Sequence, residues 1–467
     1  MTHFFGWFLT VLVVSTVCLL TLVGSHVAAK GGGGQSLNAE YMLTGELIIG
    51  LKHLGVEEAL LQPQMAGLVT QTPAQSMAKA ILLEQIRGPE AGIQALESIT
   101  LDPASSSVDS DSAQDQQRLL ELVNSLMFAQ ASGAPCKPLE PEASEFLAAQ
   151  LPFYGPFLEA QATGDTESVE SMTAASVRLL FTLFAFVLWY VFAFLAGLIG
   201  LILIVILALK RAGHGAVPTG IDLRARTGSV YIETFGFWLL AFFGLSFLAE
   251  YVFSLTDWNQ SVPELNLVGS MIAMFASLCT LYWPRLRGID SPGLFTQLGL
   301  ARVNLIKEML CGVLIYATAI PLLVIGLGLS ALLGWIIDSI FGAQPAPSHP
   351  VTDMLAGSTV NLVLIYLLAC VAAPIVEEIM FRGVLYRYLR EVSRFTGFIV
   401  SFSFAALVSS LIFAAIHPQG ISFIPVLGAL AVAFCIGREW RGSLIAPIVA
   451  HGINNLVTVT LGMLLLG

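Results

Sequence analysis

The chain is best understood from residues 374–383, Pro374-Ile375-Val376-Glu377-Glu378-Ile379-Met380-Phe381-Arg382-Gly383, which place two adjacent carboxylates and an arginine inside an apolar run. The run extends from about Leu362 to Leu385. A charged side chain in the hydrocarbon core of a bilayer is costly unless it is paired or faces a wet cavity. Apolar residues would fill these positions without that cost, so the stretch indicates a functional site within a membrane helix.

The composition is that of a polytopic membrane protein. Of 467 residues, 56% are hydrophobic and 11% are charged, and the mean hydropathy is +0.80. Apolar runs long enough to cross a bilayer lie at 178–209, 229–256, 266–283, 308–341, 357–386, 398–416, 421–437 and 444–466, with a further run from Phe4 to Val23. We therefore predict an all-α polytopic membrane bundle of about nine spans with a small exported helical domain.

The net charge of −11 is concentrated in one polar segment. Residues 31–175 hold 19 acidic and 5 basic residues, a net −14, whereas the rest of the chain holds 13 acidic and 16 basic residues, a net +3. Apolar residues at helical spacing predict a small helical domain here, with a break at Gly88-Pro89, a Ser- and Asp-rich loop at 102–116, and helices at 118–130 and 145–162. This domain could bind a protein partner. The chain has no basic patch with interleaved aromatic residues, which argues against nucleic-acid binding.

The order of these segments predicts four regions. Residues 1–30 form a membrane anchor or a signal segment, 31–175 the acidic domain, 176–345 the spans outside the charged motif, and 346–467 the membrane core that contains it. Ser25-His26-Val27-Ala28-Ala29 resembles a signal-peptidase site, but no basic region precedes the apolar run. Both an uncleaved anchor and a cleaved signal therefore remain open.

Basic residues predict the orientation of the spans. Apart from Lys30 and Arg178, at the edges of the acidic segment, they fall in alternate loops, which the positive-inside rule assigns to the cytoplasm: Lys210, Arg211, Arg224 and Arg226; Arg285, Arg287, Arg302 and Lys307; Arg387, Arg390 and Arg394; Arg438 and Arg441. Residues 31–175 are then extracytoplasmic. We expect an integral protein of the cell (inner) membrane, in contact with the lipid bilayer.

Three short patterns carry the candidate chemistry: Glu377-Glu378-x-x-x-Arg382, Phe413-x-x-x-His417 and His451-x-x-x-Asn455. The i,i+4 spacing predicts a Glu378–Arg382 pair and one shared face for His451 and Asn455. Each pattern alone has a structural explanation, as a packing ion pair, an interfacial histidine or hydrogen bonding between helices. All three in order within one apolar region are harder to explain as packing.

The spacing also bears on depth. Glu377 and His417 stand 19 and 21 residues from the turn near Thr396, roughly 30 Å at about 1.5 Å per helical residue. An antiparallel hairpin would bring them to one depth. The depth of His451 is left open, because only about 10 residues separate it from the basic turn at 438–442.

Together these patterns resemble those of the CPBP family, which contains the CAAX prenyl proteases and the bacteriocin-processing Abi proteins. The resemblance covers about residues 357–466. It implies an intramembrane endopeptidase in which Glu377, assisted by His417, acts as the base that activates water. His451 and Asn455 would stabilise the oxyanion, while Glu378 and Arg382 would hold the geometry. The substrate would be a membrane protein or a lipidated peptide, and no cofactor is implied.

Two alternatives stay open. A zinc protease could use Glu377, His417 and His451 as ligands, although the His-Glu-x-x-His helix typical of zinc proteases is absent. An immunity-like or scaffold protein could retain the fold without catalysis. Serine chemistry is disfavoured, since the chain has no Gly-x-Ser-x-Gly elbow.

Overall fold

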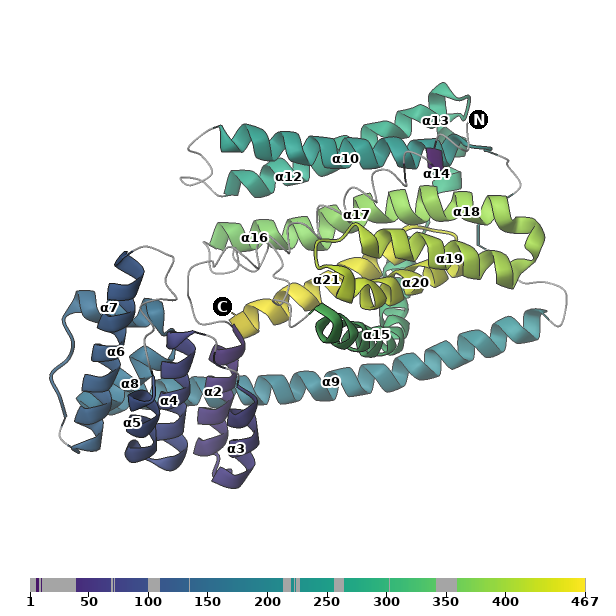
Figure 1. Cartoon of the computed structure of the whole chain (residues 1–467). Helices are drawn as coiled ribbons and strands as arrows, with labels where there is room; N and C mark the ends of the chain where they lie inside the picture. Colours follow the sequence, from purple (N-terminus) through teal and green to yellow (C-terminus); the bar gives the residue numbers. More distant parts are fainter. Residues whose placement is uncertain are drawn as a thin grey trace. The chain divides into compact units, whose positions relative to one another are not determined.

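The computed structural model of the chain (Figure 1) describes residues 6–7, 10, 39–68, 70, 72–99, 110–133, 135–212, 220–221, 223, 227–255, 264–301, 303–341 and 359–466. Within these ranges every regular element is helical, and no strand occurs. The predicted N-terminal anchor or signal at 1–30 lies outside them, apart from residues 6, 7 and 10. Arg224, Arg226 and Arg302 lie outside them as well.

The described helices include eight that are long and apolar enough to cross a bilayer. They are Thr166–Leu203, Val230–Ser254, Glu264–Leu286, Leu305–Ile337, Thr359–Thr396, Phe398–Ala415, Ile421–Arg441 and Ile445–Met463. Each matches one of the eight apolar runs found after residue 176. The all-α polytopic membrane bundle is therefore confirmed.

The chain divides into two compact units, one of which is Gly32–Trp189. Its helices are α2 (Ala39–His53), α3 (Glu58–Gly67), α4 (Pro73–Arg87), α5 (Pro89–Glu97), α6 (Ser110–Ala131), α7 (Pro141–Gln150) and α8 (Tyr154–Thr163), followed by the first part of α9 (Thr166–Ala212). They bury a common apolar core that includes Met77, Ile81, Val123, Leu147 and Leu158. The predicted break at Gly88 is confirmed: this glycine ends α4 with a φ of 95°, a value that favours glycine.

Two predictions for this unit are wrong in part. The loop expected at 102–116 is helical from Ser110 onward, because serine and aspartate are favoured at the beginning of a helix. The helix expected at 145–162 is two helices, α7 and α8, which are separated at residues 151–153. Pro152 explains the interruption, since proline disfavours helical backbone at the residue before it.

A carboxylate is buried in the core of this unit. Glu84, on α4, is 3% exposed, and neither of its side-chain oxygens has a hydrogen-bond partner in the described part of the chain. Burial raises the pKa of this carboxyl to about 7, and the nearby Lys52 ammonium opposes the shift. The carboxyl therefore exchanges its proton near neutral pH.

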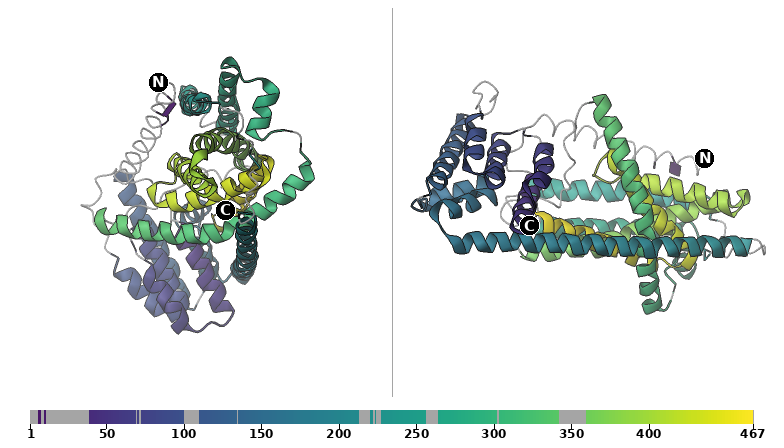
Figure 2. Two further views of the ribbon diagram at one scale, coloured as in Figure 1. Left: turned by 90° about the vertical axis from the view of Figure 1, so that its right-hand side faces the viewer. Right: turned by 90° about the horizontal axis from the view of Figure 1, so that it is seen from below.

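The other unit consists of Met1–Gly31 and Tyr190–Gly467, so its second part begins inside α9 and contains the remaining helices. They are α10 (Val230–Ser254), α12 (Glu264–Ser277), η1 (Leu278–Leu281), α13 (Tyr282–Leu286), α14 (Ser291–Leu298), α15 (Leu305–Phe341), α16 (Thr359–Leu367), η3 (Leu368–Ala372), α17 (Ala373–Glu378), η4 (Ile379–Leu385), α18 (Tyr386–Ser393), η5 (Arg394–Thr396), α19 (Phe398–Ala415), η6 (Ile421–Phe423), α20 (Ile424–Arg441) and α21 (Ile445–Leu466). In Figures 1 and 2, α19, α20 and α21 lie together beside α15 and the α16–α18 helix. The candidate residues come from this group of helices.

Several arginines expected in loops lie in helices instead. Arg387 and Arg390 belong to α18 and Arg438 to α20, and all three side chains are buried. Arg390 pairs with Glu439, and Arg441 of α20 pairs with a buried glutamate of α15. The loop prediction failed because it counted basic residues without their partners: a paired arginine can extend a helix where an unpaired one would need water. The orientation of the spans stays a prediction.

Candidate active site

The two glutamates lie in the long helix Thr359–Thr396, between two π-helical segments. η3 precedes α17, and η4 begins directly after Glu378. Pro374, the second residue of α17, has no N–H to donate to the carbonyls one turn earlier. Single π turns inside α-helices occur frequently at functional sites. The backbone around the glutamates is thus not a regular α-helix.

Glu378 is the centre of a buried polar cluster. Its Oε1 accepts a hydrogen bond from Arg382 Nη1 at 2.9 Å and contacts His451 Nδ1 at 2.9 Å. The side chains of Glu378 and Arg382 are both 0% exposed, so the predicted i,i+4 pair is fully desolvated. Arg382 Nη2 also donates to the carbonyl of Ala431 at 3.1 Å. The cluster therefore ties the glutamate helix to both α20 and α21.

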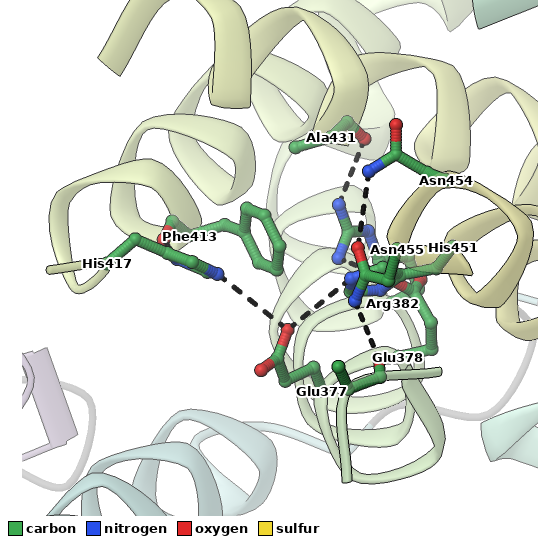
Figure 3. Close-up of polar contacts among 10 residues, drawn as sticks. Glu377, Glu378, Arg382, Phe413, His417, Ala431, His451, Asn454 and Asn455 are labelled. Carbon is green, nitrogen blue, oxygen red and sulfur yellow. Dashed lines mark hydrogen bonds and ion pairs between the residues drawn. The ribbon is translucent and has the colours of Figure 1, made fainter. Parts of the chain in front are cut away.

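Glu377 faces both histidines (Figure 3). Its Oε2 lies 3.9 Å from His417 Nε2 and 3.8 Å from His451 Nε2. The Glu377 side chain is 13% exposed, whereas its neighbour Glu378 is not exposed at all. Separations of this size are too long for direct hydrogen bonds, and Glu377 Oε2 is buried without a hydrogen-bond partner in the described part of the chain. The structure thus brings together five of the six predicted site residues, including His451, whose depth the spacing had left open.

The contacts of the second ring nitrogens assign a tautomer to each histidine. His417 Nδ1 lies 2.6 Å from the carbonyl oxygen of Phe413, an acceptor, so Nδ1 carries a proton. His451 Nδ1 carries a proton for the same reason, because it faces the Glu378 carboxylate. In the neutral ring each Nε2 then holds a lone pair. Both lone pairs point toward Glu377.

Asn455, the sixth predicted residue, has a different contact. Its Nδ2 donates to the carbonyl of Ala369 at 2.8 Å, and its Oδ1 accepts from Asn454 Nδ2 at 3.2 Å. These contacts do not test whether His451 and Asn455 present polar groups to one point, which stays a prediction. Asn455 bridges α21 to η3. Because Pro374 has no backbone N–H, the carbonyl groups one turn earlier, in η3, need another hydrogen-bond donor.

A glycine next to His451 permits a close approach of two helices. A Cβ atom at Gly452 would lie 2.7 Å from the carbonyl oxygen of Cys370 in η3. The backbones of α21 and η3 could not lie this close with a larger residue there. Gly452 therefore sets the distance between the helix of His451 and the helix of the two glutamates.

Two aromatic rings surround Arg382. Its Cζ lies 4.7 Å from the ring centroid of Phe413 and 5.1 Å from that of Phe434. Phe413 belongs to a pattern identified in the sequence, but Phe434 and the carbonyl of Ala431 were not anticipated. Nothing distinguishes Phe434 from the other apolar residues of α20 in the sequence, and a backbone carbonyl carries no sequence signal.

The zinc alternative depends on whether suitable donor atoms lie close together. In the described part of the chain, no group of three or more His, Cys, Asp or Glu side chains could hold a metal ion. The zinc alternative would use Glu377, His417 and His451, whose facing atoms are 3.8 and 3.9 Å apart. Two donors that each lie about 2.0–2.2 Å from one ion can be this far apart, so these separations do not exclude a shared ion and the zinc alternative stays open.

Comparisons with known proteins cover this same region. Residues 359–457 match the family model of the type II CAAX prenyl endopeptidases, Rce1-like. This part of the chain belongs to the CPBP/CAAX protease family. The membrane-embedded CAAX protease MroQ of Staphylococcus aureus (strain USA300) is 31% identical over 120 residues, which are 26% of this chain and 47% of MroQ. The chain thus spans about half the length of that curated relative. No solved structure matches this chain.

Proposed function

We propose that the CPBP/CAAX-type unit is an intramembrane endopeptidase. It cleaves a membrane-associated protein or a lipidated peptide with water activated by Glu377 and a histidine. The observation that carries the proposal is the position of Glu377 Oε2, which faces the Nε2 atoms of His417 and His451 at 3.9 and 3.8 Å. Three groups able to transfer protons meet there among apolar helices.

In the proposed first step, a water molecule lies between Glu377 and His417 and attacks the carbonyl carbon of the scissile peptide bond. A C–O bond forms, and the proton lost by the water passes to Glu377 or to the lone pair on His417 Nε2. The tetrahedral intermediate then breaks its C–N bond, and the same proton moves to the leaving nitrogen. A positioned base of this kind contributes about 10²–10⁴-fold to the rate.

His451 is suited to stabilise the oxyanion when its ring is protonated. Its Nδ1 already faces Glu378, and a proton on Nε2 would turn that atom into a donor directed at the reaction centre. Glu378 would balance the charge of the imidazolium. Asn455, whose Nδ2 donates to Ala369, contributes by holding α21 in place. The oxyanion role that the resemblance implies for both residues is thus assigned to His451, and Asn455 has a structural role.

The test compares the N-termini of membrane proteins in cells that carry the wild type or Glu377→Gln. The substitution keeps the shape of the side chain and removes its basicity. Peptides that begin at an internal cleavage site should appear with the wild type and disappear with Glu377→Gln. Glu250→Gln is the matched control, since Glu250 lies exposed in α10. Cleavage that persists with Glu377→Gln would refute the role of this base.

The same experiment separates the alternatives. Identical N-termini in the wild type, Glu377→Gln and a strain without the protein would favour an immunity-like or scaffold role. Loss of cleavage by the purified protein after chelation, with recovery on adding Zn²⁺, would favour the zinc protease. Cleavage that is unaffected by chelation supports glutamate–histidine chemistry.

We further propose that the protein lies in the inner membrane with residues 31–175 outside the cytoplasm.

A further inference from the structure

We propose that Phe434 is a positioning residue of the site, in an inference that rests on the proposed function. Phe434 lies on α20, outside the three sequence patterns, and its side chain is fully buried. Its ring is stacked against His451, with centroids 5.0 Å apart and planes inclined by 24°. The same ring lies 5.1 Å from Arg382 Cζ. One aromatic side chain therefore contacts both partners of Glu378.

The stacking determines where the two nitrogens of His451 point. An imidazole that is held only by its Nδ1 contact can still tilt about that contact. A flat ring against its face prevents this tilt, so Nε2 stays directed at Glu377 while Nδ1 faces Glu378. An aliphatic side chain of similar volume would fill the space without constraining the ring plane in the same way.

Phe413 provides a comparison within the same site. Its ring lies 4.4 Å from that of His417 and 4.7 Å from Arg382 Cζ, and it meets His451 edge-on at 5.8 Å. Each histidine thus has its own aromatic neighbour, and both rings also contact the guanidinium of Arg382. Phe434 packs against His451 as Phe413 packs against His417.

The contact is also electrostatic. The face of an aromatic ring attracts a cation, and the attraction is larger when the pair is desolvated. The ring of Phe434 therefore attracts the guanidinium of Arg382, which lies 5.1 Å from its centroid, and would attract an imidazolium formed at His451 during the proposed reaction.

The experiment uses the full-length protein in lipid nanodiscs. Its reporter is a fluorogenic peptide that spans the cleavage site found in the N-terminal comparison. Phe434→Leu should lower kcat by about 2- to 30-fold with little change in KM, because Phe434 is buried behind the reacting groups. Phe434 replaced by phenylalanines of increasing fluorination should lower kcat in graded steps, since fluorine weakens the ring's attraction for a cation at nearly constant shape. Phe235→Leu is the control, because that buried ring contacts Trp238 and Phe381.

The outcomes are distinct. A graded loss of kcat in the fluorinated series, with KM little changed, supports the positioning role. Unchanged kcat in the fluorinated series, or an equal loss in Phe235→Leu, would overturn it, even where Phe434→Leu itself folds poorly. A wild-type protein that cleaves nothing would instead overturn the proposed function, on which the inference rests.

Discussion

Removing the guanidinium of Arg382 should reduce stability and activity together. Its side chain is fully buried, donates to Glu378 at 2.9 Å and to the Ala431 carbonyl at 3.1 Å, and lies between two phenylalanine rings. In Arg382→Ala the buried carboxylate keeps, among the described residues, only its contact with His451. Breaking a buried ion pair from one side costs about 3–5 kcal/mol, because an uncompensated charge remains.

A second variant isolates the cost of leaving the Glu378 carboxylate uncompensated. In the double variant Glu378→Gln/Arg382→Met both charges are absent, so no uncompensated charge is left. Replacing a buried pair by groups of similar volume is often close to neutral. The double variant should therefore recover most of the stability lost in Arg382→Ala. Its activity should stay low, because His451 has lost the carboxylate that orients its ring.

Thermal unfolding followed by tryptophan fluorescence in detergent micelles would measure the effect. The expected loss for Arg382→Ala corresponds to a decrease in apparent Tm on the order of 10 °C. Two results would refute the reasoning. An unchanged Tm with lost activity would assign Arg382 a direct chemical role, and a double variant as unstable as the single one would show that the uncompensated carboxylate is not the cause.

Three further predictions concern other parts of the chain. Gly452→Ala places a Cβ 2.7 Å from a carbonyl oxygen of η3. It should lower cleavage by about 10²-fold through displacement of α21, whereas Gly428→Ala, where no atom lies within 4 Å, should leave cleavage unchanged in the same peptide assay. The raised pKa of Glu84, about 7 against 4.5, means that the folded state binds the proton more tightly. The contribution of Glu84 to the free energy of unfolding should be highest below pH 4.5 and fall by about 3 kcal/mol as the pH rises to 7. Hydrogen exchange of α4 in the full-length protein should show this dependence, and its persistence in Glu84→Gln would contradict the assignment. For the orientation, an impermeant thiol reagent should label Cys136 in intact cells. It should label a cysteine at Phe395→Cys, a position 80% exposed, only after lysis. The reverse pattern would show that the orientation is opposite to the predicted one.

The membrane fold could be predicted from the sequence because its signal is long and redundant. Each span is a run of apolar residues, so an error of a few residues at its ends does not change its identity. The Glu378–Arg382 pair could also be predicted, since i,i+4 neighbours share one helix face whatever surrounds them. The approach of His417 to Glu377 followed from counting residues along two consecutive helices.

What could not be predicted depends on how non-consecutive helices pack. The contact of His451 with Glu378 requires the close approach of α21 at Gly452, which no local pattern encodes. The contact of Asn455 with the Ala369 carbonyl follows from π-helical backbone, which has no composition of its own. Phe434 stands among other apolar residues of α20, and only its neighbours in space distinguish it from them.

The π-helical segment η4 has a consequence for insertions and deletions. Bonding from i to i+5 accommodates one more residue per turn than the regular i to i+4 ladder. A deletion within η4 is therefore one that the backbone can absorb by returning to the regular ladder. Removing Val384, which follows the Glu378–Arg382 pair, would keep that pair intact. Because the π turn holds one residue more than the regular ladder needs, the helix beyond the deletion would keep its facing, and the buried arginines of α18 would keep their surroundings. Length variation of one residue at this point would therefore leave both the glutamates and the far end of the helix in place.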